Sequence, residues 1–283
     1  MTPTVSRKGA HRPALKKAAR KRLIQVSVFV GAIALWWAIA RFAQIDPVIL
    51  PGPDAVVGEV IDGNRCVESA SGSGRVNCGV QGYFLWQHLL ATVQRIAVGL
   101  GAGVLVGVLL GWVLASNSII RSVVEPYVTF QRALPPLGYI GLLIVWFGIG
   151  GTSKIVLLFL ASFPAVAIAT LTGVIGVPKS WGLSVQTLGA SRFQVLRDVT
   201  VPGAAPSIIV GIRLAAGLAW ASIVAAEMND GIPGIGGLAY ISGTQLDTAL
   251  TIACIVIIGI TALAFDQLLV ALERKVAPWQ GKQ

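Results

Sequence analysis

Residues Ile96–Ile120 read IAVGLGAGVLVGVLLGWVLASNSII, a run of 25 residues that contains no charged side chain. About 20 apolar residues at 1.5 Å each are enough to cross the hydrocarbon core of a bilayer as a helix. Inside lipid the backbone must satisfy its own hydrogen bonds, so a helix is expected here and an open sheet is not. This stretch therefore predicts a membrane protein built from helices.

Five further stretches have the same apolar character. One of them, Pro206–Met228, is interrupted only by Arg213 and Glu227 near its ends. The other four carry no charge, and they are Leu23–Ala40, Ala133–Ser153, Ile155–Pro178 and Thr248–Phe265. Only 12% of the 283 residues are charged, whereas soluble domains carry about 25%. The sequence predicts an all-α, polytopic membrane protein with six transmembrane helices.

The second predicted helix carries a glycine at every fourth position, namely Gly99, Gly103, Gly107 and Gly111. On a helix these positions nearly align and form a groove that lets another backbone approach closely. We therefore expect this helix to pack tightly against another one, within the subunit or across a dimer. The alternative is a membrane helix that is rich in glycine without any such contact.

Lysine and arginine are distributed unevenly, and residues 1–22 hold eight of them. Because basic segments remain on the cytoplasmic side of a membrane, this tail is expected inside. Alternation over six helices then places 16 Lys and Arg in inside segments and three in outside segments. The pattern predicts a first helix at 23–43 and both termini inside, with 273–283 as the cytoplasmic C-terminus.

The net charge of +10 permits two other interpretations of the N-terminal tail. Nucleic-acid binding is disfavoured because the basic residues cluster beside the membrane without aromatic residues between them, a pattern that anionic lipid explains better. A cleaved signal peptide is the closer rival, because Ala38-Ile39-Ala40 follows a basic and then an apolar segment. Signal peptides have an apolar region of about 7–15 residues, and this one is longer. We therefore prefer an uncleaved first helix.

Residues 44–87 form a long extracytoplasmic segment in this topology. Cys66 and Cys78 flank a stretch of small residues, Ser69–Gly74, within it. In an oxidising compartment such a pair is expected to form a disulfide. The alternative is two free thiols in a disordered loop. No metal site is expected, because two thiols without a nearby histidine leave the coordination incomplete.

Residues 177–205 form a polar, partly basic segment that the topology holds inside. Pro178-Lys179-Ser180 can begin a helix with Ser180 as its N-cap, and Gly189 can end that helix. A second helical stretch, Ser191–Val199, is amphipathic and stops at Pro202. Two short helices around a glycine make a compact projection that can transmit force to a partner as a rigid body.

No catalytic residues are expected. A phosphate-binding loop needs two glycines around four residues, then Lys and Ser or Thr. The nearest approach, Gly173–Ser180, has Pro178 where the second glycine must stand. The two histidines, His11 and His88, have no cysteine or acid at a spacing that indicates a catalytic set.

The segment 177–205 resembles the loop through which the membrane subunits of ATP-driven (ABC-type) importers contact their ATPases. Gly189, a gap of nine residues, Val199, Val201 and Pro202 match that pattern. The usual Glu-Ala-Ala triplet is replaced here by Leu183-Ser184-Val185. We call residues 177–205 the coupling loop, and the resemblance implies that the following residues contact an ATPase: Leu183, Ser184, Val185, Gly189, Ala190, Ser191, Arg192, Val199, Val201 and Pro202.

The resemblance extends over roughly residues 84–280 and is closest to the taurine, aliphatic-sulfonate and nitrate group of permeases, among these the taurine permeases. The stretches that carry it are Trp146–Gly150, Ser153–Ile155, Leu188–Arg192, Ala225–Met228, Leu272–Arg274 and Pro278–Trp279. It implies a type I ABC importer permease (MetI-like) fold with a core at 88–272, in the cytoplasmic (inner) membrane of a prokaryote.

The same resemblance implies a set of partners. Two permease copies pair as a homodimer, two ATPase subunits bind ATP and Mg, and an extracytoplasmic binding protein delivers the substrate. Taurine or another alkanesulfonate is the first expectation for that substrate. The alternatives are a nitrate, bicarbonate or heterocycle importer of the same group, or an ATP-independent secondary transporter.

Charged and polar residues inside the spans are candidates for the translocation pathway. Arg213 could attract a sulfonate, although snorkelling or an ion pair is the simpler interpretation of its position near a helix end. Glu227 is expected to fix the outer gate region, because it would repel an anion. Trp220 and Ser222 are further candidates for residues that face the cavity.

Overall fold

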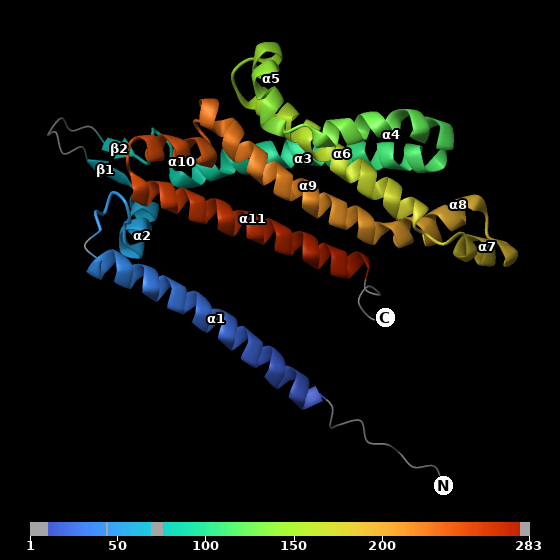
Figure 1. Ribbon diagram of the computed structural model, residues 1–283, viewed down its shortest axis with the longest axis horizontal. Coiled ribbons are helices and arrows are strands. Elements are labelled where there is room, and N and C mark those ends of the chain that lie inside the picture. Colours follow the sequence, from blue (N-terminus) through green and yellow to red (C-terminus); the bar gives the residue numbers. More distant parts are fainter. Residues whose placement is uncertain (1–10, 44, 69–75, 278–283) are drawn as a thin grey trace, which may run out of the picture.

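The computed structural model describes residues 11–43, 45–68 and 76–277. It is an elongated bundle whose long helices run along one axis (Figure 1). Among these residues, five helical segments are long and apolar enough to cross a membrane. Three of them are the whole helices α3 (Leu85–Ser116), α6 (Gly151–Ile175) and α11 (Thr248–Val276). The other two are Leu23–Phe42, which is part of α1 (His11–Phe42), and Arg192–Asp230, which includes α9 (Val201–Asp230). The predicted all-helical membrane architecture is confirmed.

The third predicted span, Ala133–Ser153, is not one helix. The chain forms α4 (Ser118–Ala133), then the 3₁₀ turn η1 (Pro136–Tyr139) and α5 (Ile140–Phe147), with a bend of 93° between the two parts. Leu134 is extended, with ψ 127°, because the residue before a proline is disfavoured in the helical conformation. The part of the chain that the structure describes thus has five continuous candidate spans, or six if this bent pair counts as one.

The second predicted span, Ile96–Ile120, has different bounds from the helix observed. Helix α3 ends at Ser116, and Asn117 caps the next helix by accepting hydrogen bonds from the backbone N–H groups of Ile119 and Ile120, at 2.9 and 3.2 Å. Asparagine is a favoured N-cap because its side-chain oxygen satisfies donors that the first turn leaves free. Apolar composition alone does not reveal this boundary.

The glycine ladder of α3 contacts α6, and this pair forms the most extensive helix contact in the structure. A methyl group on Gly107 would lie 2.7 Å from the Phe163 carbonyl oxygen and 2.8 Å from Val166 Cβ. The expected close packing is therefore confirmed, and its partner lies within the same subunit. Next to the glycine ladder, Ile96 and Leu158 pack with Ile223 of α9 in the main core.

Replacing Gly107 by leucine should destabilise the bundle by about 3 kcal/mol, because the added atoms force α3 away from α6. The thermal midpoint of the purified protein in detergent, followed by size-exclusion fluorescence, measures this effect. Gly101→Leu is the matched control, since a Cβ added at Gly101 has no atom of the described residues within 4 Å. Equal midpoints for the two variants would contradict the assigned contact.

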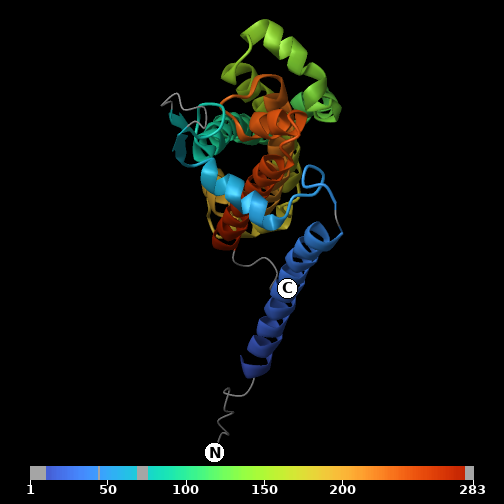
Figure 2. The ribbon, with the colours of Figure 1, turned by 90° about the vertical axis from the view of Figure 1, so that its left-hand side faces the viewer.

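One end of the bundle, which we call the hairpin end, is capped by shorter elements (Figure 2). They are α2 (Pro53–Asp62), which packs on α11, the antiparallel strands β1 (Cys66–Glu68) and β2 (Val76–Cys78), and α10 (Ile235–Thr244). Cys66 and Cys78 face each other in the strand register and are joined by a disulfide. Burial, then the charges of Asp247 and Asp62, raise the pKa of the Glu59 carboxyl, which therefore takes up a proton at a higher pH than an isolated glutamate.

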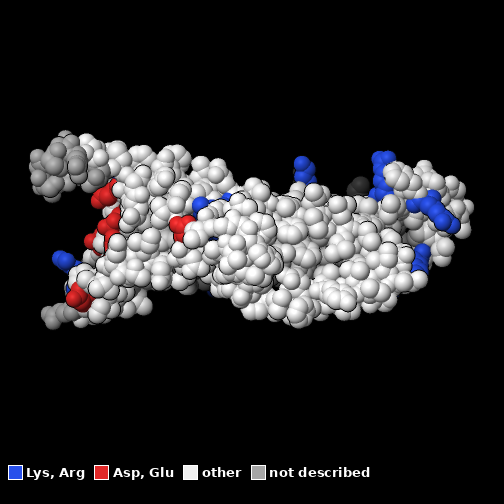
Figure 3. Space-filling view, turned by 90° about the horizontal axis from the view of Figure 1, so that it is seen from above, with Lys and Arg blue, Asp and Glu red and all other residues white. Residues whose placement is uncertain are grey.

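The opposite end, which we call the loop end, consists of α7 (Lys179–Thr187), α8 (Arg192–Val195) and the π-helical turn η2 (Leu196–Thr200). Acidic residues gather toward the hairpin end and most visible Lys and Arg toward the loop end, with a largely uncharged band between them (Figure 3). Such a band is expected where lipid surrounds a protein. Helix α1 diverges from the bundle and contacts it through α2, where Trp36 Nε1 donates to the Pro51 carbonyl at 3.1 Å.

Candidate functional site

The coupling loop is a tight helical projection at the loop end. Helix α7 ends in a Schellman motif, in which the Gly189 N–H donates to the Gln186 carbonyl at 2.9 Å and the Ala190 N–H donates to the Val185 carbonyl at 3.2 Å. The motif requires a left-handed residue after the cap, and Gly189 has φ +92°. Glycine adopts this conformation without the strain that a Cβ would add. Gly189 therefore reverses the chain, as predicted.

Helix α8 begins with a reciprocal capping box. The Ser191 N–H donates to Gln194 Oε1 at 2.7 Å, and the Gln194 N–H donates to Ser191 Oγ at 3.3 Å. This pair fixes the start of α8 directly after the Gly189 turn. The predicted N-cap of the preceding helix was wrong: Pro178 caps α7, and Ser180 lies in its first turn. Proline serves there because the helix begins without needing its N–H.

Residues from both halves of the coupling loop line one hollow of about 390 Å³. Val185 of α7 and the pair Val199 and Pro202 meet there, beside Trp181. The loop also exposes large apolar side chains, including Leu188 (88% exposed) and Phe193 (68% exposed). Exposed apolar groups of this kind are typical of surfaces that contact a protein or a membrane.

The other predicted contact residues lie around the same projection. Leu183 and Ser184 are exposed on α7, and Ser184 Oγ donates to the Ser180 carbonyl at 2.8 Å. Arg192 is exposed at the start of α8, Ala190 is half-buried in the turn, and Val201 is exposed at the start of α9. All ten predicted contact residues are thus at least partly exposed at the loop end.

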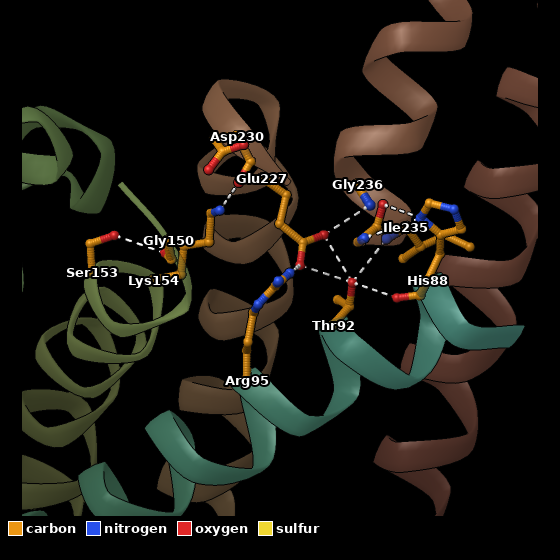
Figure 4. A network of polar contacts seen from close by, with 11 residues as sticks. His88, Thr92, Arg95, Gly150, Ser153, Lys154, Glu227, Asp230, Ile235 and Gly236 are labelled. Atoms are coloured by element: carbon orange, nitrogen blue, oxygen red, sulfur yellow. Dashed lines mark hydrogen bonds and ion pairs between the residues drawn. The ribbon is translucent and has the colours of Figure 1, made fainter. Parts of the chain in front are cut away.

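A second cluster of polar contacts, which we call the outer latch, lies at the hairpin end (Figure 4). Glu227 is fully buried, and its Oε1 lies 2.5 Å from Arg95 Nη1, whose side chain is 15% exposed. Thr92 Oγ1 lies 2.9 Å from both carboxylate oxygens. A buried carboxylate is tolerated only when it is paired and hydrogen-bonded, and this one has both kinds of partner.

The outer latch also holds the N-terminus of α10. The Gly236 N–H donates to Glu227 Oε2 at 3.0 Å, and the Ile235 N–H donates to Thr92 Oγ1 at 3.0 Å. The first N–H groups of a helix have no partner within it, and here side chains from α3 and α9 supply the acceptors. The carboxylate also stabilises the positive end of the helix dipole.

His88 and Lys154 complete the outer latch. His88 Nδ1 accepts a hydrogen bond from the Gly234 N–H at 3.1 Å, which leaves Nε2 to donate to the Val80 carbonyl at 3.1 Å. Lys154, buried at the start of α6, donates to the Asp230 carbonyl at the end of α9. The latch therefore ties α3, α6, α9 and α10 together.

The family described as "Binding-protein-dependent transport system inner membrane component" matches residues 103–278. The chain belongs to this family. It is 37% identical over 265 residues to the taurine transport system permease protein TauC of Escherichia coli (strain K12), with 91% of each chain covered. It is 28% identical over 249 residues to the nitrate import permease protein NrtB of Synechococcus elongatus, covering 87% of this chain and 86% of that protein.

The fold is also similar to that of a solved permease. A chain from inward-facing conformations of the MetNI methionine ABC transporter superposes with a TM-score of 0.60 at 20% identity, over 68% of this chain and 96% of that one. The protein is therefore the multi-pass inner-membrane permease of a bacterial ABC importer, with a MetI-like fold, and it is not itself catalytic. Permeases of this family bind no cofactor themselves.

Among the permease's predicted pathway residues, Arg213 is engaged in ion pairs. Its Nε and Nη2 contact the Asp266 carboxylate at 2.9 and 3.2 Å, and its Nη1 lies 3.4 Å from Glu273 Oε2. The two carboxylates balance the positive charge of the guanidinium, so it attracts a further anion only weakly. Trp220 and Ser222 are buried within the bundle in this conformation. Glu227 is the one of these four that lies in the outer latch.

The partners of Glu227 and of Arg213 were not predicted from the sequence. Arg95 and Asp266 lie directly beside the uncharged stretches 96–120 and 248–265, where apolar composition alone predicts no role for them. The sequence next to Thr92, His88 and the glycines of α10 contains no pattern that predicts their contacts. The available signal was the glycine-rich run Gly231–Gly237, which brings the start of α10 against a buried carboxylate.

Proposed function

We propose that this permease translocates taurine or a closely related alkanesulfonate by alternating access. The observation that supports this substrate class best is the 37% identity to a taurine permease over 91% of both chains. Nitrate, bicarbonate or a heterocycle remains the second candidate, because a nitrate permease is also a relative at 28% identity. An ATP-independent secondary transporter is the least supported alternative, since it gives the coupling loop no partner.

The coupling loop is proposed as the contact with the ATPase. Its exposed Leu188 and Phe193 and the hollow beside Trp181 offer the apolar surface that such a contact needs. In this scheme two ATPase subunits bind ATP and Mg, and their closure moves the coupling loops of two permease copies. A binding protein releases substrate at the hairpin end, which would be extracytoplasmic.

This scheme also assigns the regions of the chain. The proposed order is a basic tail at 1–22, a first helix at 23–43, an extracytoplasmic segment at 44–87, the permease core at 88–272 and a C-terminus at 273–283, with both termini cytoplasmic. Residues 1–10 and 278–283, including Pro278 and Trp279 of the family resemblance, lie outside the described residues. Helix α1 extends from His11, so part of the basic tail continues the first helix.

Within this scheme we assign the outer latch to the gate region. Glu227 holds the start of α10 and the first turns of α3 together on the side from which substrate would enter. Arg213, paired with Asp266 and Glu273, is assigned a structural role. Trp220 and Ser222 would have to become exposed in another conformation to contact substrate.

The disulfide between Cys66 and Cys78 is proposed to form in the extracytoplasmic compartment and to hold the β1–β2 hairpin closed. In intact protein isolated without reductant, neither thiol should react with an alkylating reagent under denaturing conditions. Prior reduction should make both reactive. Quantitative alkylation of both cysteines without reduction would contradict the proposal.

Uptake by proteoliposomes tests the substrate and the energy source together. The permease would be reconstituted with its ATPase and its binding protein, and radiolabelled taurine and nitrate would be compared with and without internal ATP. We expect ATP-dependent accumulation of taurine. Accumulation of nitrate alone would support the second candidate, and uptake that needs no ATPase would support the secondary transporter.

A further inference from the structure

A groove of about 720 Å³ lies between α6 and α9, on the half of the bundle nearer the loop end. We call it the inner groove. Its walls are small or apolar residues, among them Ala165 and Ala169 of α6 and Gly211 and Gly217 of α9. A volume of this size is typical of sites that hold a small organic molecule. The contact between α6 and α9 thus leaves a concave surface instead of closing completely.

The inner groove has one charged lining residue, Arg132. Arg132 lies near the end of α4, about 21 Å along that helix from Ser118 at 1.5 Å per residue. Within the described part of the chain, no carboxylate lies within 4.0 Å of its side-chain nitrogens. Arg213, by contrast, is neutralised by two carboxylates.

Hydroxyl groups add further polarity to the same surface. Ser207 is exposed on the wall formed by α9, and Thr172 is exposed on the wall formed by α6, where its own hydroxyl donates to the Ile168 carbonyl at 2.8 Å. A cation, a hydroxyl donor and short apolar walls are complementary to an anionic head group on a short alkyl chain. A guanidinium is the side chain best shaped to hold two oxygens of such a head group.

We propose that the inner groove is a transient binding site for the sulfonate group of the substrate, with Arg132 as its cation. The inference rests on the proposed function for the identity of the substrate and adds a site within the permease itself. It assigns part of the selection of anions to this chain. Arg132 is itself exposed, so its guanidinium is available to an anion in the groove.

Thiol labelling tests this site without relying on transport. Ser207→Cys would be made in a Cys254→Ala background and purified as the full chain with its ATPase. The probes are 2-sulfonatoethyl methanethiosulfonate, whose transferred group is an ethanesulfonate, and the cationic trimethylammonium analogue. The thiolate attacks the sulfenyl sulfur, forms a mixed disulfide and releases methanesulfinate, so each probe reports access to the groove.

The anionic probe should react faster than the cationic one, and Arg132→Gln should reduce the ratio of the two rates about tenfold, because the field at the thiol loses one positive charge. Arg132→Lys should retain most of the ratio. Ser184→Cys on the exposed surface of α7 is the matched control, and its ratio should not change with Arg132→Gln. Taurine at millimolar concentration should slow labelling at position 207 only when Arg132 is present.

Two outcomes would overturn the proposal. A thiol at position 207 that neither probe modifies would mean that lipid or a second copy of the chain fills the groove. A rate ratio that is the same with and without Arg132 would mean that the guanidinium does not act on the groove. In either case, normal ATP-dependent taurine uptake would still support the proposed function. If labelling is as expected but taurine is not taken up, the inner groove would still be an anion site, and taurine would not be its substrate.

Discussion

Glu227→Ala should lower the stability of the permease by about 3 kcal/mol or more, because it leaves Arg95 partly buried without its carboxylate partner. It also removes the acceptor of the Gly236 N–H at the start of α10. Thermal midpoints of the purified protein in detergent measure the loss. In a thermodynamic cycle, the double variant Arg95→Ala/Glu227→Ala should be less destabilised than the sum of the two single variants.

The exposed pair Arg197 and Asp198, separated by 3.5 Å, is the matched control for this experiment. Asp198→Ala should change stability by less than about 0.5 kcal/mol, because solvent screens an exposed ion pair. Additive effects of the Arg95 and Glu227 substitutions would show that the two side chains do not interact. If Glu227→Ala loses no more stability than Asp198→Ala, the outer latch does not stabilise the permease.

Gly189→Asp should abolish productive coupling, with ATP-dependent uptake reduced more than about tenfold. The new side chain must adopt φ +92°, which costs on the order of 1 kcal/mol. No atom of the described residues lies within 4 Å of the added Cβ, so the carboxylate would project from the coupling loop toward the proposed ATPase contact. Membrane insertion and dimer formation should be unaffected, and ATP hydrolysis should continue without transport.

The matched control for this prediction is Gly82→Asp at the hairpin end. Gly82 has φ +81° and also has nothing within 4 Å of an added Cβ, so the variant carries the same backbone strain away from the coupling loop. It should transport at close to the normal rate. Normal uptake by Gly189→Asp would contradict the docking assignment, and equal losses in both variants would attribute the effect to strain alone.

The long helices could be predicted from the sequence because the bilayer fixes both their length and their apolar composition. The bounds of the uncharged stretch 155–178 agree with those of α6, Gly151–Ile175, to within a few residues. The turn at Gly189 was also predictable, since few residues other than glycine adopt a left-handed conformation after a helix. In each case a short local pattern carries the physical constraint.

The bent pair α4 and α5 shows where local patterns are insufficient. Pro135 and Pro136 interrupt helix geometry, but a proline does not specify the direction in which the chain leaves it. The apolar residues after them are equally suitable for a helix that continues α4 and for one that bends away from it by 93°. The direction depends on contacts that α5 makes with α6, which the sequence does not reveal.

The outer latch could not be predicted for a different reason. Arg95 and Glu227 are separated by 132 positions, and neither has a local pattern that identifies its partner. Arg213 illustrates the same limit, because its role depends on Asp266 of α11, 53 positions away. A single sequence shows that an intramembrane charge needs a partner, but only the packing of the helices identifies it.

Affinity purification of the chain in mild detergent tests most directly whether it is the membrane subunit of a pump driven through the coupling loop. Mass spectrometry of the co-purifying proteins should identify an ATPase in amounts equal to the permease. The ATPase should be lost with Leu188→Asp, which places a charge on the most exposed apolar residue of the loop, and retained with Gly82→Asp. Absence of any ATPase under conditions that preserve permease dimers would contradict the account.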